Sequence, residues 1–352
     1  MATAKANGVA KNGTNGSTTK AAATQHSDLH EQDKERLREW LDRNERPFNV
    51  KIDAPTRKRK RTEEMHLEEG LLTDSLKVLY EVKPRDKWES LRRYKKFTVG
   101  SESIATGQCI LVKHDESSED TKIETEPQWK AQVLEVRALD SEHVYIRVAW
   151  LNRPEDLAHG RQPHHGKHEL ILSNEMDIID AMTVNGSLNV VALDDQDDDS
   201  AAIEDQYFWR QSYNLVTKKF SELRKICRDQ TPANPDEMII QCSNQTCREW
   251  LHVKCLAEQA LKDHEAAVKQ GTLDAENPRV KDEDNSATQA TPAVYTQNKR
   301  KTIKAELYLK GDPKGLDDVP ASKSEIVIIA NGQPYAQDLV CLTCGVAIED
   351  DT

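Results

Sequence analysis

The stretch Cys242-Ser243-Asn244-Gln245-Thr246-Cys247-Arg248-Glu249-Trp250-Leu251-His252-Val253-Lys254-Cys255 decides how the C-terminal part of this chain folds. Four residues separate the first two cysteines, and two residues separate the histidine from the last cysteine. Cys227 precedes this stretch, and the pair Cys341-x2-Cys344 follows it. Zinc takes four nitrogen or sulfur ligands at the corners of a tetrahedron, and short spacings place two ligands on one turn. The pattern therefore predicts a zinc-binding region between Cys227 and Cys344.

The alternative interpretation is that these are ordinary buried cysteines, but free cysteines rarely gather at such spacings. The first 30 residues contain no apolar stretch typical of a signal peptide, and no run of 18 apolar residues is present. We therefore expect a reducing compartment, where clustered cysteines are more often metal ligands than disulfides. We expect no membrane partner.

The composition of the 352-residue chain is polar, with 37% hydrophobic, 31% charged and 5% aromatic residues. This is too polar for one large core, so we expect small folded modules between disordered segments. The formal net charge of −12 argues against strong direct DNA binding, which depends on clustered Lys and Arg. An acidic chain suits a basic partner such as a histone tail, or its acidity only keeps it soluble.

The N-terminal region divides into two parts. Residues 1–33 are low-complexity and predict a disordered tail. Residues 34–71 predict a short helix, with Leu37, Trp40 and Leu41 on one face, and a basic linker. Five consecutive basic residues in this linker indicate a nuclear import signal, or else a solvated charge run: Arg57, Lys58, Arg59, Lys60 and Arg61.

Residues 72–220 predict a β-rich module. Apolar or alternating runs over 104–112, 129–136, 143–150, 169–172 and 189–193 are typical of short strands. Several short strands with polar connections favour a small β-barrel or sandwich. The acidic residues Asp194, Asp195, Asp197, Asp198 and Asp199 predict a surface loop. The expected fold class is mainly β with small α content, a β module followed by a zinc finger.

The cysteine-rich region resembles the PHD finger family over residues 226–230, 234–242 and 247–256. In that family four cysteines, one histidine and three cysteines bind two zinc ions in a cross-brace. The first and third ligand pairs share one ion, and the second and fourth pairs share the other. Carried over, the resemblance implies one complete site formed by Cys242, Cys247, Cys341 and Cys344. It implies three ligands of the other site, namely Cys227, His252 and Cys255.

The chain departs from this family at two places. The Cys-x-Cys spacing would put the missing ligand at Lys225, whose ammonium group does not bind zinc. Three interpretations stay open: water or a side chain such as Asp229 is the fourth ligand, the site is empty, or the finger is degenerate. A catalytic zinc is disfavoured, because no Glu or His is placed by motif as a general base. The long gap between Cys255 and Cys341 predicts a disordered insertion over about 262–301 within a finger spanning 221–350.

The PHD resemblance implies a reader of histone tails, with Trp250 and Asp236 as candidate tail-binding residues. Trp250 has the place of a methyl-lysine pocket wall, although a core position is an equal alternative. A cage gains cation–π attraction from several aromatic faces, and Ala233 stands where a second aromatic often precedes the Asn-Pro-Asp stretch. Methyl-lysine recognition by this finger is therefore disfavoured.

The β module resembles a BAH domain, with motifs at residues 148–156, 160–161, 165–166, 169–177 and 207–211. Some BAH domains bind trimethyl-lysine on histone tails in an aromatic cage. The resemblance places Trp129, Trp150 and Asn152 at the cage positions, although barrel core is the alternative for both tryptophans. Replacing one aromatic wall by Asn152 costs roughly 1 kcal/mol. Glu175 and Asp177 lie where the family contacts the peptide, and their charge suits a basic tail.

The leading hypothesis is a nuclear, non-enzymatic protein that reads histone tails or nucleosomes through the BAH-like module, with zinc as cofactor. The first alternative is an interaction scaffold in a chromatin regulatory complex that does not itself read a histone mark. The second alternative is a RING-like ubiquitin ligase. The Trp250-x-His252 spacing and the upstream Asn-Pro-Asp stretch argue against it.

Overall fold

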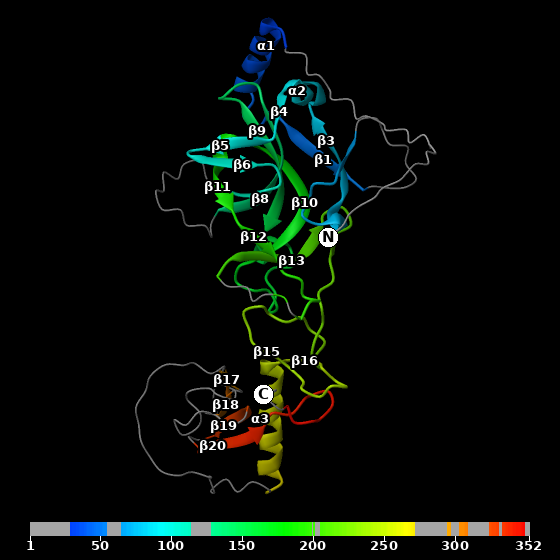
Figure 1. The fold of residues 1–352 in the computed structure, drawn as a ribbon, viewed down its shortest axis with the longest axis vertical. Helices are drawn as coiled ribbons and strands as arrows, with labels where there is room; N and C mark the ends of the chain where they lie inside the picture. Colours follow the sequence, from blue (N-terminus) through cyan, green and yellow to red (C-terminus); the bar gives the residue numbers. More distant parts are fainter. Residues whose placement is uncertain are drawn as a thin grey trace, which may run out of the picture.

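The computed structural model describes residues 29–54, 65–113, 128–198, 200, 205–271, 294–296, 303–308, 324–330 and 333–348. The predicted tail up to residue 28, the basic run at 57–61 and Asp199 lie outside these residues. Figure 1 shows a large β module at one end of the long axis and the cysteine-rich finger at the other. Within the described residues, no helix is both long and apolar enough to cross a membrane.

A nine-stranded sheet forms the frame of the β module, and Figure 1 shows how it curves. Its main path runs β11-β7-β8-β9-β10-β13-β12, with β4 on β8 and β14 on β13. Most neighbours are antiparallel, but β13 lies parallel to both β10 and β12. The strands are β4 Arg92–Tyr94, β7 Cys109–Val112, β8 Trp129–Ala138, β9 Val144–Asn152, β10 Glu169–Asp180, β11 Val184–Leu188, β12 Val190–Ala192, β13 Tyr207–Asn214 and β14 Lys219–Phe220.

Two smaller sheets, helix α2 and three short 3-10 turns also belong to the module. The strands β1 Asn49–Asp53, β3 Val78–Lys83 and β2 His66–Glu68 form an antiparallel sheet in that order. The strands β5 Lys96–Val99 and β6 Glu102–Ala105 form a hairpin. Helix α2 spans Arg85–Ser90, and short 3-10 turns cover Asp74–Leu76, Pro154–Asp156 and Ala181–Thr183.

The module packs its apolar strand residues into a core between β7, β8 and β9. Val133, Ile146 and Val148 are fully buried there, together with Ile104 and Ile110. The prediction of a mainly β fold is confirmed. The prediction of one strand over 104–112 is wrong, because β6 ends at Ala105 and β7 begins at Cys109. Gly107 lies between them with φ of 92°, a conformation that turns the chain and suits glycine.

Arg147 of β9 connects the sheet β1-β3-β2 to the nine-stranded sheet. It is buried, and its guanidinium lies 3.3 Å from Glu135 Oε2 and 2.5 Å from Glu68 Oε2. Its guanidinium also stacks over the Tyr80 ring at 4.0 Å. A buried charge must be paired, so Glu68 of β2 is held to β8 and β9 although it precedes the predicted module boundary at residue 72.

Helix α1, Glu31–Asp42, docks on the same module. Leu37 and Leu41 are buried against Phe48, Trp88 and Tyr145. The predicted apolar face is thus turned toward the β module, with Trp40 partly buried beside it. At the end of the helix, Asp42 Oδ1 lies 3.0 Å from His143 Nε2, and Asp140 Oδ1 lies 2.8 Å from His143 Nδ1.

The docking of α1 should depend on pH. Burial alone would lower the pKa of His143, but its hydrogen bonds to Asp42 and Asp140 outweigh burial and raise it. Burial likewise opposes the change at Asp140, yet the hydrogen bonds from His143 and the neighbouring backbone lower its pKa to about 2. The His143 contribution is full below its unfolded pKa of about 6.5 and is lost as pH rises through the raised folded value. The Asp140 contribution is lost as pH falls toward about 2.

Hydrogen exchange of the α1 amides, corrected for intrinsic rates, should therefore show the greatest protection between about pH 4 and 6.5. A His143→Gln variant should lose the decline above neutral pH. The same decline in that variant would assign the effect to another group.

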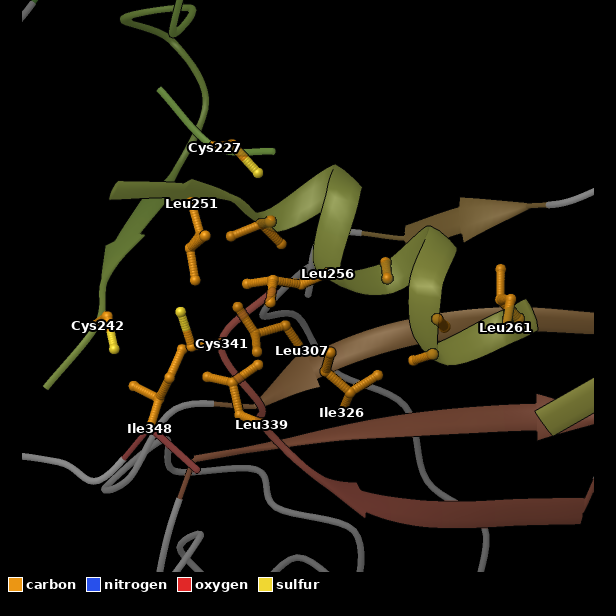
Figure 2. Close-up of a cluster of buried hydrophobic side chains, with 14 of the residues drawn as sticks. Cys227, Cys242, Leu251, Leu256, Leu261, Leu307, Ile326, Leu339, Cys341 and Ile348 are labelled. Carbon is orange, nitrogen blue, oxygen red and sulfur yellow. The ribbon is translucent and has the colours of Figure 1, made fainter. Parts of the chain in front are cut away.

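The finger combines a two-stranded hairpin with a helix and a second sheet. The hairpin strands are β15 Ile239–Gln241 and β16 Trp250–His252, and helix α3 spans Val253–Lys269. The sheet is antiparallel in the order β17 Val294–Thr296, β18 Ile303–Tyr308, β19 Glu325–Ala330 and β20 Gln333–Asp338. Leu256 and Leu261 of α3 share one buried cluster with Leu307 and Ile328. Figure 2 shows this cluster with Cys341 lying among Leu251, Leu307 and Leu339.

The insertion predicted as disordered over about 262–301 begins inside α3. Residues 262–269 are helical because Leu261 and His264 are buried on the face that meets the sheet. Ala257 and Ala260 extend this face toward the N-terminus of the helix. The strand β17 also falls in the predicted insertion, and its other residues after 271 lie outside the described ranges.

Candidate functional site

Five side chains singled out from the sequence line one pocket of about 430 Å³ on the β module, which we call the tryptophan pocket. These five are Trp129, Trp150, Asn152, Glu175 and Asp177. The sheet brings them together, since Trp129 begins β8, Trp150 and Asn152 end β9, and the two acids lie in β10. The other lining residues were not predicted: Arg46, Val112, Lys113, Ile179 and Thr183.

The two tryptophans form two walls of this pocket. Their ring centroids lie 6.3 Å apart, and their planes meet at 61°. Trp129 is 37% exposed, whereas Trp150 is half-buried and packs against the main core. Two aromatic faces inclined at this angle form an apolar corner, and their π electrons attract a cation.

Polar groups complete the pocket. Asn152 Nδ2 is buried and has no hydrogen-bond partner among the described residues, so a donor remains available at the wall. Glu175 is exposed and Asp177 is half-buried. Lys113 is also a lining residue, but its ammonium donates to the carbonyl of Met182 at 3.1 Å. The aromatic faces and the two carboxylates together suit a cationic ligand.

An irregularity in β10 places the two acids. The pairing of β10 with β9 shifts between Leu172 and Met176. Ser173 Oγ donates to the carbonyl of Trp150 at 3.0 Å and accepts the backbone N–H of Glu175 at 3.2 Å. At this bulge the Glu175 side chain is exposed, and the Ser173 hydroxyl connects the backbone of Glu175 to that of Trp150. Bulges beside functional sites commonly redirect a side chain in this way.

The structure gathers the finger cysteines into two groups. The first group holds Cys242, Cys247, Cys341 and Cys344, whose sulfurs lie within 4.8 Å of one another. Cys242 and Cys344 are 3.7 Å apart, and Cys247 and Cys341 are 3.9 Å apart. Four thiolates at about 2.3 Å from a tetrahedral zinc ion are separated by about 3.8 Å. These residues therefore fit zinc.

The second group holds Cys227, His252 and Cys255, together with Asp229. Cys255 Sγ lies 3.8 Å from His252 Nδ1 and 3.4 Å from an Asp229 oxygen. His252 Nδ1 lies 3.3 Å from the other Asp229 oxygen. All seven predicted ligands are thus divided between two groups in the cross-brace order. The fourth member follows Cys227 instead of preceding it. It is Asp229, which the sequence leaves open as one possible fourth ligand.

Metal binding in the first group would be linked to protons. Burial raises the pKa of Cys242 to about 12, whereas the backbone N–H of Val346 lowers the pKa of Cys344 to about 7. A metal ion binds thiolates, so loading this group releases protons, and its affinity falls in acid.

The remaining predicted tail-binding residues, Trp250 and Asp236, lie at the junction of the finger and the β module. Trp250 Nε1 donates to Asp198 Oδ1 at 2.8 Å, and Asp236 accepts the backbone N–H of Lys167 at 2.5 Å. Asn234 Nδ2 donates to the carbonyl of Pro163 at 2.9 Å. The Asn-Pro-Asp stretch and the acidic loop therefore hold the modules together, a role that sequence spacing did not reveal.

Gly166 permits the close approach at this junction. A Cβ added there would lie 3.0 Å from Phe208 Cζ and 3.3 Å from an Asp236 oxygen. Phe208 is buried and cannot easily retreat. The glycine of the His165-Gly166 motif is therefore explained by the packing of the finger on the β module.

An Asp236→Ala substitution should loosen the junction by about 1 kcal/mol, the usual contribution of one hydrogen bond. Hydrogen exchange should rise at residues 163–168, and the finger should unfold at a lower temperature. The matched control is Glu237→Ala, because Glu237 is the adjacent exposed carboxylate. Equal effects of the two substitutions would contradict the role given to Asp236.

The comparisons with known proteins identify the family of the β module. Residues 102–224 match the family model of the BAH domain, so this part of the chain is a BAH domain. Among curated proteins, the chain is 28% identical over 214 residues to the Chromatin remodeling protein SHL of Arabidopsis thaliana, covering 58% of this chain and 90% of that protein. It is also 28% identical over 167 residues to the Chromatin remodeling protein EBS of the same plant, covering 46% of this chain and 68% of that protein.

The comparison with solved structures gives a weaker likeness. The crystal structure of the yeast Rsc2 BAH domain is 14% identical, with a TM-score of 0.28. The match covers 38% of this chain and 55% of that chain.

Proposed function

We propose that this protein is a nuclear, chromatin-associated binding protein that recognises trimethyl-lysine on a histone tail through the tryptophan pocket. The observation that carries the proposal is the meeting of Trp129 and Trp150 at 61° beside Glu175 and Asp177. A trimethylammonium group is large, cationic and apolar at its surface, so it gains from aromatic faces more than from a hydrogen-bonding site. The BAH match and the chromatin remodeling names of SHL and EBS support a chromatin role.

The electrostatics of the chain favour the same ligand class. Histone tails are basic, and the chain carries a formal net charge of −12. Complementary charge speeds encounter and helps select the partner, while the aromatic faces distinguish the methylated side chain. We propose binding rather than catalysis as the activity of the BAH domain.

We further propose that the cysteine-rich region is a PHD-type finger that holds zinc as a structural cofactor. The sulfur separations of 3.7 and 3.9 Å in the first group support this assignment. The finger would brace the BAH domain through Trp250, Asn234 and Asp236, because these side chains contact residues of that domain.

A titration calorimetry series tests the reader function. The full zinc-loaded chain is titrated with histone-tail peptides that differ only in the methylation of one lysine. At least one trimethylated peptide should bind about tenfold or more tightly than its unmodified counterpart, which corresponds to about 1.4 kcal/mol. If the folded protein binds no methylated peptide more tightly than the unmodified one, the proposal is wrong.

The second candidate is an interaction scaffold in a chromatin regulatory complex. It is favoured by Asn152, which stands at the pocket wall where a third aromatic would be expected. In that case the same titrations should fail, while purification from a nuclear extract would still recover the complex.

A further inference from the structure

The finger has a carboxylate where a cysteine would complete its second metal group. We propose that Asp229 is the fourth ligand of the second zinc ion, so that the finger holds one site of four thiolates and one site of Cys227, Asp229, His252 and Cys255. This inference rests on the proposal that the finger binds zinc. It assigns the fourth ligand of the second group, which the PHD spacing placed at Lys225, a residue that does not bind zinc.

The distances around Asp229 fit a tetrahedral zinc ion. Zinc bonds of about 2.3 Å to sulfur and about 2.0 Å to nitrogen or oxygen put nitrogen and oxygen about 3.3 Å apart, and sulfur about 3.5 Å from either. The separations are 3.3 Å between His252 Nδ1 and Asp229 Oδ1, 3.4 Å between Cys255 Sγ and Asp229 Oδ2, and 3.8 Å between Cys255 Sγ and His252 Nδ1. The two donors thus face different oxygens of the carboxylate, and one of these oxygens lies within 4.8 Å of all three other donor atoms. Exposed carboxylates are common on protein surfaces without a metal ion. The carboxylate of Asp229 differs from these because it lies close to two thiols and an imidazole.

The backbone around Asp229 is shaped to present it beside Cys227. Ile226 N donates to the carbonyl of Thr231 at 3.0 Å and closes a short loop. Within this loop Cys227 and Gln230 have φ of 61° and 54°, and Gln230 Nε2 donates to the carbonyl of Cys227 at 2.8 Å. Residues other than glycine adopt this left-handed conformation rarely, mainly in tight turns and at functional sites. Cys227 and Asp229 thus form a ligand pair separated by one residue. In the PHD pattern the corresponding pair would be residues 225 and 227.

Thr231 orients the carboxylate. Its hydroxyl donates to Asp229 Oδ2 at 2.9 Å, and its backbone N–H donates to Oδ1 at 3.4 Å. Ligating carboxylates are commonly fixed by such outer hydrogen bonds, whose loss weakens metal affinity by about 10- to 100-fold. The proposed ligand therefore has the support that a metal site requires.

The two sites should differ in chemistry. The first presents four soft thiolates, whereas the second presents two thiolates, one imidazole and one hard carboxylate. Because zinc prefers thiolates, a chelator should remove the zinc ion of the second site before that of the first. A finger with two unequal sites would lose its ions in two separate phases.

Zinc content and cobalt spectra of the full chain test the assignment. Elemental analysis should give two zinc ions per chain, released by a chelator in two phases of one ion each. Asp229→Asn keeps the shape of the side chain but not its charge, and it should weaken binding of one ion by more than about 100-fold, beyond the loss of an outer partner. Asp229→Cys should keep two ions. In the cobalt form it should raise the thiolate-to-metal absorption from six thiolates to seven.

Lys225→Ala is the matched control, because residue 225 is where the Cys-x-Cys spacing of PHD fingers would place the fourth ligand. It should leave both ions in place. Two ions of unchanged affinity in Asp229→Asn, or a single ion in the unaltered chain, would overturn the assignment while leaving zinc in the first site. A chain that binds neither zinc nor cobalt would overturn the zinc proposal as well.

Discussion

Replacing Trp150 by Leu should reduce the affinity for a trimethyl-lysine peptide by about 30-fold, because a desolvated cation–π contact contributes about 2 kcal/mol. Leucine keeps an apolar side chain against the main core, where Trp150 packs, but it removes the aromatic face. Calorimetric titration of the variant against the best trimethylated peptide measures the effect, and thermal unfolding shows whether the fold is retained.

Two controls separate the aromatic face from general packing. Trp150→Phe should retain part of the affinity, because it keeps a smaller π face at the same position. Trp129→Leu should also weaken binding at little cost in stability, since Trp129 is 37% exposed. A peptide carrying a neutral carbon isostere of trimethyl-lysine should bind the unaltered protein less tightly. Equal affinity for the isostere, or full affinity of Trp150→Leu, would remove the cation–π basis of the proposal.

Replacing Cys341 by Ser should cost at least the zinc ion of the first group and unfold the finger. Structural zinc in isolated fingers contributes about 10–16 kcal/mol, far more than a small core can supply alone. Cys341 is 1% exposed and lies in the cluster that joins α3, β18 and β19 to the hairpin, as Figure 2 shows. Its loss should therefore abolish the packing of the second sheet as well as the first metal group.

The matched control is Cys109→Ser, which makes the same chemical change at a buried cysteine of the BAH domain. It should lower stability modestly and leave the zinc content unchanged. Hydrogen exchange of α3 and β18–β20 and elemental analysis give the readouts. Retention of both ions and of α3 protection in Cys341→Ser would contradict the role of the first group.

Much of the candidate site could be predicted because its residues belong to local patterns. The strands that carry Trp129 and Trp150 have apolar runs that identify them, and the finger cysteines stand at metal-ligand spacings. The order of the ligands in the chain also matches their division into two groups. These features depend on side-chain chemistry and short separations, which a sequence displays directly.

Other features depend on contacts between distant residues. The sequence offers Asp229 only as one possible fourth ligand among other interpretations. His252 and Cys255 come near it because the backbone N–H of Cys227 donates to the carbonyl of Trp250 at 2.9 Å. Asp236 and Trp250 carry the same side chains whether they meet a peptide or the BAH domain. Only the packing of the two modules gives them Lys167 and Asp198 as partners.

The sequence by itself determined that a β-rich module precedes a cysteine-rich region, since strand periodicity and cysteine spacing are local properties of the chain. It also determined which aromatic and acidic residues were candidates for a cationic ligand. Tertiary structure decided how they are used. The register of β8, β9 and β10 closes the tryptophan pocket, and the turn at Cys227 brings Asp229 into the second metal group. The physical reason is that register, turn conformation and module packing are set by long-range contacts, which no local pattern records.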